Sequence, residues 1–387
     1  MISPKSIAEK LLKAIELLRS SCGSYGLFAG SGPRYRHQCW TRDAALALIP
    51  ALSSIERFSE ILFLDLSYLA EVAETHLKSL TKLQGRNGAI PILFADFGEL
   101  IEKKMRKCSW NGSQLTVNSF ILRRILDGMH GSLDTFPEFR DFPNADQRGL
   151  YRLTPGTTDS ELLFAYALIN HYGRSCEAAR RAMAYVENHY VHDGLHCGAD
   201  WRDTMEKFFS DKPLLSNNAL LYAVYIGMGE EEKAAALKEA VERTFWTGET
   251  YLDYPDAKRF DPLGVSLGIM HGLIPKERHA KLIKDFHLVD SPCGVTIQCR
   301  HKPYLEGEAE VIEQTDGIVV WPFVVGFTIL ATADVDRSFA TEQFEKLHNL
   351  DGFAEWYDPT SGVNWGEYQQ GWSAALYIRA VEKLGLL

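Results

Sequence analysis

The sequence predicts an all-helical protein, and two observations support this fold class. Apolar residues recur at helical spacing in stretch after stretch, as with Ile7, Leu11 and Ile15 near the N-terminus. Short loops that bear glycine, proline and aspartate separate most of these stretches, and no strand-like segments alternate with them. Such a chain has to bury every helix, so its unusual residues gather in the loops at helix ends.

The helical spacing marks about thirteen segments in the 387 residues. They are residues 7–18, 41–53, 64–84, 115–130, 162–169, 174–190, 216–228, 231–245, 262–273, 276–289, 316–333, 336–349 and 371–384. Two segments rich in Gly, Pro, Asp and Asn, 87–114 and 131–157, are expected to form lid or insertion loops, or a small hairpin. No low-complexity linker divides the chain, which favours a single domain over residues 1–387.

Composition and charge argue against several classes of protein. The net charge of −10 and the pI near 5.7 argue against nucleic-acid binding, because nucleic-acid binders carry a basic stripe. No window approaches the roughly 18 uninterrupted apolar residues that span a bilayer, and the charged N-terminus lacks a signal-peptide core. We therefore expect a cytoplasmic protein that binds no membrane. Seven scattered cysteines without a C-x-x-C pair indicate reduced thiols rather than disulfides or a zinc site.

The most informative segment, residues 352–376, sets the carboxylate of Glu355 among aromatic side chains before an apolar C-terminal helix. These aromatics are Trp356, Tyr357, Trp365, Tyr368 and Trp372. Indole and phenol faces suit the C–H faces of a pyranose, and aromatic surroundings tune the pKa of an acid. A single tryptophan would be interpreted as core. Five aromatics within seventeen residues favour a sugar site instead.

The loop before residue 46 places Trp40, Arg42 and Asp43 at a helix start. Asp43 and Arg42 could serve only the helix, as a first-turn acid and its salt-bridge partner. An arginine fork beside a carboxylate is also the pairing that grips vicinal hydroxyls. Chemistry alone leaves both interpretations open.

A second loop contains the string D-W-R-D, residues 200–203. Glycoside hydrolysis needs one carboxylic acid to protonate the leaving oxygen and one carboxylate to activate water or attack the anomeric carbon. Trp201 and Asp200 would raise the pKa of Asp203, which makes Asp203 a candidate acid. Arg202 would lower that pKa if it paired there. The alternative is an aspartate N-cap with a solvated arginine.

Polar loops also precede other predicted helices. Thr158 or Asp159 is expected to be an N-cap, with Glu161 as a capping-box partner if the cap is Thr158. Later loops contain Asp256, Arg259, Asp261, Gln314, Asp316 and Trp321. Their recurrence at successive helix starts predicts that one end of the molecule is polar and aromatic. His271 lies on an apolar helix and is expected to be a core histidine.

Seven motifs follow one another from about residue 35 onward. They are W-T-R-D (40–43), G-A-I-P (88–91), T-D-S-E-L-L-F (158–164), D-W-R-D (200–203), N-N-A-L-L-Y (217–222), D-G-I-V-V-W-P (316–322) and E-W-Y-D-P followed by W-S-A-A-L (355–376). Their order resembles the toroidal glycosidases, which include glucoamylases, amylo-1,6-glucosidases, neutral invertases and mannosylglycerate-type hydrolases. The resemblance implies an (α/α)6 toroid, a double ring of about twelve helices with the active site at one end of the inner ring.

The resemblance also implies an inverting hydrolase whose two carboxyls lie about 6.5–9.5 Å apart. Asp203 falls on the family acid and Glu355 on the family base, although Asp200 competes for the role of acid. Arg42 and Asp43 fall on the residues that hold the sugar. The full set of predicted substrate contacts is Trp40, Arg42, Asp43, Asp159, Asp200, Trp201, Arg202, Trp321, Trp356, Tyr357 and Trp372.

The expected substrate is a small carbohydrate, an α-linked glucoside or oligosaccharide. Two alternatives remain: a sugar epimerase or lyase on the same toroid, which would use His or Tyr as base, and a non-catalytic carbohydrate-binding protein. No G-x-x-x-x-G-K-[ST], G-x-G-x-x-G, H-E-x-x-H or G-x-S-x-G string is present. No cofactor, metal or nucleic acid is therefore expected.

Overall fold

The computed structural model describes most of the chain, in several ranges. They are residues 2–32, 35–36, 38–62, 68–95, 158–202, 209–255, 257, 260–298 and 318–387. Within these ranges twelve helices have ten or more residues, and the strands are only two or three residues long. The predicted all-helical class is confirmed.

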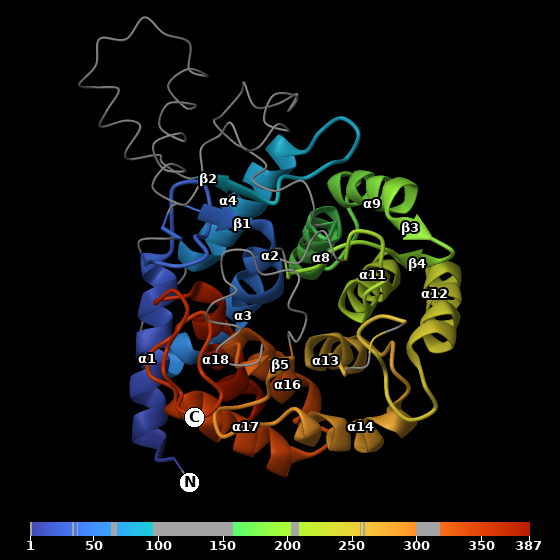
Figure 1. Ribbon diagram of the computed structural model, residues 1–387. Helices are drawn as coiled ribbons and strands as arrows, with labels where there is room; N and C mark the ends of the chain where they lie inside the picture. Colours follow the sequence, from blue (N-terminus) through green and yellow to red (C-terminus); the bar gives the residue numbers. More distant parts are fainter. Residues whose placement is uncertain are drawn as a thin grey trace, which may run out of the picture.

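Six helical elements of the described ranges form a closed inner ring (Figure 1). The first is a continuous helical segment of α2 (Thr41–Asp43), the π-helix η1 (Ala44–Leu48) and α3 (Ile49–Leu62). The others are α8 (Ser160–Tyr172), α11 (Leu215–Met228), α13 (Pro262–His271), α16 (Pro322–Thr332) and α18 (Gly371–Lys383). Each packs against the next, and α18 closes the ring against η1 and α3.

A second layer of helices surrounds this ring (Figure 1). It consists of α1 (Pro4–Ser20), α4 (Tyr68–Leu83), α9 (Glu177–His189), α12 (Glu231–Phe245), α14 (Lys276–Leu288) and α17 (Arg337–Asn349). Helices α4, α9, α12, α14 and α17 each follow an inner element and pack on it or beside it, and α1 packs on α18. The predicted double ring is confirmed.

The sequence separates the two layers by where its polar residues fall. Every residue of α16, with the sequence PFVVGFTILAT, is buried, so this helix has no face for water. Helix α9 instead buries one stripe that includes Ala179, Ala182 and Val186. Helices that are apolar all round have to be enclosed, whereas amphipathic helices cover a core from outside. The two kinds of helix alternate along the chain and so form two concentric layers.

This alternation fixes the direction of the inner helices. Each outer helix returns the chain to the end where the previous inner helix began, so the inner helices run the same way and start at one end of the ring. Short strand pairs lie in loops at helix ends: β1 (Gln38–Trp40) with β2 (Leu93–Ala95), β3 (Val191–His192) with β4 (Leu195–His196), and β5 (Ile297–Gln298) with β6 (Ile318–Val319).

Two predicted helix boundaries are wrong, and some predictions lie outside the described residues. The helix expected over 316–333 begins only at Pro322, because β-branched Ile318 and Val319 form strand β6 and proline favours a first helical position. The helix expected over 41–53 continues to Leu62. Segment 115–130 and most of the two predicted lid segments are not described, although residues 93–95 form β2.

No helix in the described ranges is both long enough and apolar enough to cross a membrane. The cysteines described there, Cys22, Cys39, Cys176, Cys197 and Cys293, are free thiols, as the sequence predicts.

His76 on α4 is a core histidine that has to be neutral. Its side chain is fully buried against Phe94, and its Nδ1 accepts a hydrogen bond from the backbone N–H of Leu27 at 3.1 Å. Burial lowers the pKa of His76 to about 3. His271 lies at the C-terminal end of α13, away from the helix starts, and burial lowers its pKa to about 4. His271 is only half-buried, with its Nε2 3.4 Å from the Tyr166 hydroxyl, so its place in the core stays a prediction.

The pKa of His76 predicts a specific pH dependence of stability. Between the folded pKa of about 3 and the ordinary histidine value, the unfolded chain binds more protons than the folded one, so the free energy of unfolding rises with pH. We expect His76→Gln to flatten this slope by up to about 1.4 kcal/mol per pH unit in urea unfolding between about pH 5 and about pH 6.5. The exposed His192→Gln is the control. Equal slopes in all three proteins would contradict the assignment.

Candidate functional site

The residues that immediately precede the six inner helices meet at one end of the ring. These N-cap residues are Trp40 before α2, Asp159 before α8, Leu214 before α11, Asp261 before α13, Trp321 before α16 and Gln370 before α18. Three of the six are tryptophan or aspartate positions predicted from the sequence to bind substrate. The predicted polar and aromatic end of the molecule is therefore confirmed for the described residues.

Glu355 lies on the segment that connects α17 to α18 across this end. A β-bridge joins Tyr357 to Val320, just before α16, and another joins Gln370 to Gly30. The Glu355 carboxylate is buried, with 8% of the residue exposed, and its Oε1 accepts a hydrogen bond from the Tyr35 hydroxyl at 2.6 Å. Such a bond stabilises the ionised carboxylate, the form that a general base requires.

Four tryptophans from distant segments form one aromatic cluster at the same end. The Trp321 ring lies 5.3 Å from that of Trp201 and 5.6 Å from those of Trp356 and Trp372, between ring centroids. The indole N–H groups of Trp201, Trp321 and Trp372 have no hydrogen-bond partner within the described ranges. Tyr368 is 58% exposed and does not belong to this cluster.

Tyr357 supports this segment from inside the protein. It is fully buried, and its hydroxyl donates to the Asp351 carbonyl at 2.7 Å and accepts from the Ala354 N–H at 2.8 Å. Burial raises the pKa of this hydroxyl. Tyr357 thus holds the turn over residues 351–354, just before Glu355, and its predicted contact with substrate remains a prediction.

Arg42 connects the start of α2 to the tryptophans. Its guanidinium lies 5.2 Å from the Trp40 ring centroid and 5.6 Å from that of Trp372, and its Nη1 donates to the Trp201 carbonyl at 3.0 Å. Asp43, which is also buried, has an Oδ2 3.7 Å from the Arg42 Nε. The two side chains therefore belong to the ring end with the tryptophans, and not only to their own helix.

Gln370 is a member of this group that the sequence did not indicate. Its side-chain Nε2 donates to Asp43 Oδ1 at 3.3 Å. The residue is the N-cap of α18 and is buried. A buried carboxylate held by an amide at one oxygen and an arginine at the other is fixed in orientation.

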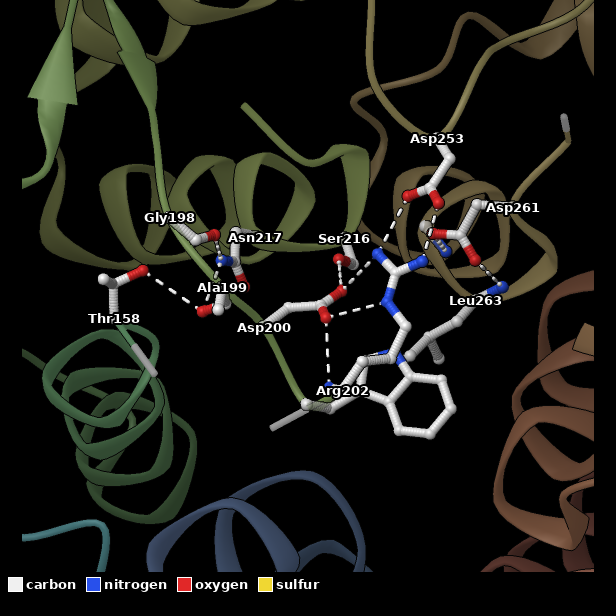
Figure 2. A network of polar contacts seen from close by, with 12 residues as sticks. Thr158, Gly198, Ala199, Asp200, Arg202, Ser216, Asn217, Asp253, Asp261 and Leu263 are labelled. Carbon is white, nitrogen blue, oxygen red and sulfur yellow. Dashed lines mark hydrogen bonds and ion pairs between the residues drawn. The ribbon is translucent and has the colours of Figure 1, made fainter. Parts of the chain in front are cut away.

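The D-W-R-D loop is held by an ion-pair network that includes an aspartate 51 residues further along the chain (Figure 2). Arg202 donates from Nε and Nη2 to the two oxygens of Asp200, both at 2.9 Å. It also donates to Asp253, from Nη1 at 2.6 Å and from Nη2 at 2.9 Å. Asp200 in addition accepts from the Ser216 hydroxyl at 2.6 Å. Although burial lowers the pKa of Arg202, its two carboxylate partners hold it well above the usual value.

This network helps to distinguish Asp200 from Asp203 as candidates for the general acid. Both oxygens of Asp200 accept hydrogen bonds from Arg202, so neither oxygen of Asp200 is free to hold a proton for a substrate. Asp203 lies outside the described residues. Asp261 caps α13 by accepting from the N–H groups of Leu263 and Gly264, and burial, then the neighbouring Asp253, raises its pKa to about 7.

The N-N-A-L-L-Y motif explains how α11 supports the same loop. Asn217 donates to the Gly198 carbonyl at 3.1 Å (Figure 2). Asn218 accepts from the His196 N–H at 2.9 Å. Gly198 has a φ of +123°, and a Cβ there would lie 2.3 Å from the Thr158 Oγ1. Only glycine fits so close to the start of α8.

At the start of α8 the cap is Asp159, and no capping box forms. Glu161 instead accepts from the backbone N–H of Ile90, in the G-A-I-P motif, at 2.9 Å. Asp256, Arg259, Gln314 and Asp316 lie outside the described residues. In the part of the chain that is described, no three His, Cys, Asp or Glu side chains are arranged to hold a metal ion.

Breaking the Arg202 network is expected to be costly. Asp253→Asn would leave the Arg202 guanidinium, whose side chain is only 11% exposed, with one carboxylate instead of two, and we expect a loss of about 3 kcal/mol in the free energy of unfolding. The matched control is Asp334→Asn, because Asp334 forms its ion pair with Lys383 at the surface; its loss should stay below about 0.5 kcal/mol. Similar small losses for both variants in chemical unfolding would contradict the structural role of Asp253.

No protein-family model and no curated protein matches the sequence. Among solved structures, the chain is similar to a glycosidase determined in complex with glucose, with a TM-score of 0.62, 13% identity and coverage of 99% of this chain and 98% of that chain. The chain is also similar to the mannosylglycerate hydrolase of glycoside hydrolase family 63 from Thermus thermophilus, determined in complex with glucose. The TM-score is 0.60 and the identity 15%, with coverage of 95% of this chain and 98% of that chain. For the same hydrolase in complex with Tris and D-glycerate, the TM-score is 0.59 and the identity 15%, with coverage of 95% of this chain and 99% of that chain. The chain has the fold of these glycosidases, a helical toroid.

Proposed function

We propose that the protein is an inverting glycoside hydrolase that acts on a small α-linked glucoside or oligosaccharide. The observation that carries this proposal is the Glu355 carboxylate, buried beside a tryptophan cluster and hydrogen-bonded by Tyr35 at the end of the ring where the inner helices start. The names of the structural neighbours support it, because one is a glycosidase with glucose and another a mannosylglycerate hydrolase with glucose.

In the proposed reaction Glu355 is the general base and Asp203 the general acid. Glu355 removes a proton from a water molecule, whose oxygen forms a bond to the anomeric carbon. At the same time the bond from this carbon to the leaving oxygen breaks, and Asp203 donates a proton to that oxygen. The configuration at the anomeric carbon is thereby inverted. Asp200 is the weaker candidate acid, since Arg202 binds both of its oxygens.

The remaining residues of the ring end suit the binding of one sugar ring. Asp43 can accept hydrogen bonds from vicinal hydroxyls, and the Arg42 guanidinium lies beside it. The face of the partly exposed Trp321 can cover C–H groups of a sugar, and the buried rings of Trp201 and Trp372 pack against it. A site of this kind recognises a small neutral carbohydrate, and the complex of the neighbouring hydrolase with D-glycerate is consistent with a small leaving group.

Replacing either proposed carboxyl tests the function. With sucrose, trehalose, maltose, isomaltose, glucosylglycerate and mannosylglycerate as a panel, we expect the wild-type protein to hydrolyse at least one compound. Glu355→Gln and Asp203→Asn should each lower kcat on that compound by about 10² to 10⁴.

The exposed Glu249→Gln serves as the control and should keep full activity. Circular dichroism and thermal unfolding would establish that the variants fold. Undiminished activity in Glu355→Gln would refute the assignment of the base, and binding of a sugar without any hydrolysis would favour a carbohydrate-binding protein.

The bond from Tyr35 predicts a change in the pH profile of the enzyme. Tyr35→Phe removes a donor that favours the ionised form of Glu355, so the acidic limb of kcat/KM should move to higher pH. The measurement is kcat/KM as a function of pH for the wild-type protein, Tyr35→Phe and the control Tyr25→Phe, whose side chain is 54% exposed. A uniform drop without a shift of the limb would argue that Tyr35 acts on another group.

A further inference from the structure

A cavity of about 800 Å³ lies in the wall of the toroid, apart from the helix starts. It is enclosed by η1 and α3, by the outer helix α4, and by the later parts of α8 and α18. Arg379, which lines it, is eight residues beyond the first residue of α18, or about 12 Å along the helix. The site described above and this cavity are therefore at different levels of the ring.

Arg379 brings a positive charge into this cavity without a matching negative partner. Within the described ranges it has no ion pair, and it donates one hydrogen bond, from Nη1 to the Leu46 carbonyl at 3.5 Å, the limit for such a bond. Its guanidinium lies 5.8 Å from the Phe327 ring centroid. Partial burial lowers the pKa of Arg379, and the nearby Tyr166 and Glu382 offset this only in part.

The nearest carboxylate on the same helix, that of Glu382, contacts Arg57 and Ser54 instead of Arg379. One of its oxygens lies 2.6 Å from Arg57 Nη1, and the other accepts a hydrogen bond from the Ser54 hydroxyl. Glu382 therefore ties α18 to α3 and leaves Arg379 only partly compensated. The half-buried guanidinium of Arg379 lines the cavity and has one long hydrogen bond to the Leu46 carbonyl, so its other N–H groups can donate to an anion there.

We propose that this cavity is a binding site for a small organic monocarboxylate with an apolar body, whose carboxylate pairs with Arg379. The planar guanidinium matches the two oxygens of a carboxylate. Ala45, Ile49, Ala73 and Ala167 give the cavity apolar walls, and its volume lies in the usual range for ligands of this size. The carboxylates of Glu56 and Glu382, which also line it, disfavour multiply charged anions such as phosphate.

The first test uses the wild-type protein and three probes: 3-phenylpropionate, the uncharged 3-phenylpropanol and inorganic phosphate. In isothermal titration calorimetry we expect saturable binding of 3-phenylpropionate with one site per chain, and at least about tenfold weaker binding of the alcohol and of phosphate. Excess glucose should not displace the acid. No binding of the acid up to about 10 mM, equal binding of acid and alcohol, or full displacement by glucose would each overturn the proposal.

The second test assigns the binding to Arg379. Arg379→Met keeps the length of the side chain but removes its charge, and we expect at least about a tenfold loss of affinity for 3-phenylpropionate. Arg180→Met, at an exposed arginine on α9, is the matched control and should bind as the wild-type protein does. Thermal unfolding of both variants would establish folding. Unchanged affinity in folded Arg379→Met would refute the site, and the comparison of acid and alcohol remains decisive if that variant does not fold.

Discussion

The inner helices are buried on all sides, and the rest of the structure depends on this constraint. Helix α16 has no residue that faces water, so it is stable only within a complete second layer. The ring closes because α18 packs back against α3, and each outer helix returns the chain to the same end. Residues from all parts of the chain, such as Trp40, Asp261 and Gln370, are thereby brought together at one set of helix starts.

The electrostatics of that end follow from the same geometry. The positive ends of six helix dipoles point toward it, and aspartates and glutamates near helix starts are stabilised there. Asp43, Asp159 and Asp261 occupy such positions and are buried; for Asp261, burial and then Asp253 outweigh this effect and raise its pKa to about 7. Arg42 and Arg202 provide the remaining compensation through fixed ion pairs. Helix starts and arginines together allow several carboxylates to lie close to one another at this end of the ring.

The helices and several residues at their starts could be predicted from the sequence, because they depend on the residues nearby in the chain. Helical periodicity gave nearly all the helices, and loops before apolar helices located Trp40, Asp159 and Trp321. The contacts that were missed are pairings between distant segments. Nothing near Asp253 indicates that it will meet Arg202, and nothing near Tyr35 points to Glu355, 320 residues later. The π-helix η1 and the cavity beside Arg379 likewise depend on how three-dimensional packing closes the ring.

In the proposed reaction Glu355 activates a water molecule that attacks the anomeric carbon from the face opposite the leaving group. The most direct measurement is the configuration of the sugar released first, followed by proton NMR during the initial minutes of hydrolysis of an α-glucoside. Inversion predicts that β-glucose appears first and that the α-anomer accumulates only by mutarotation. Initial release of α-glucose would contradict the claim, because retention requires a carboxylate that attacks the sugar itself.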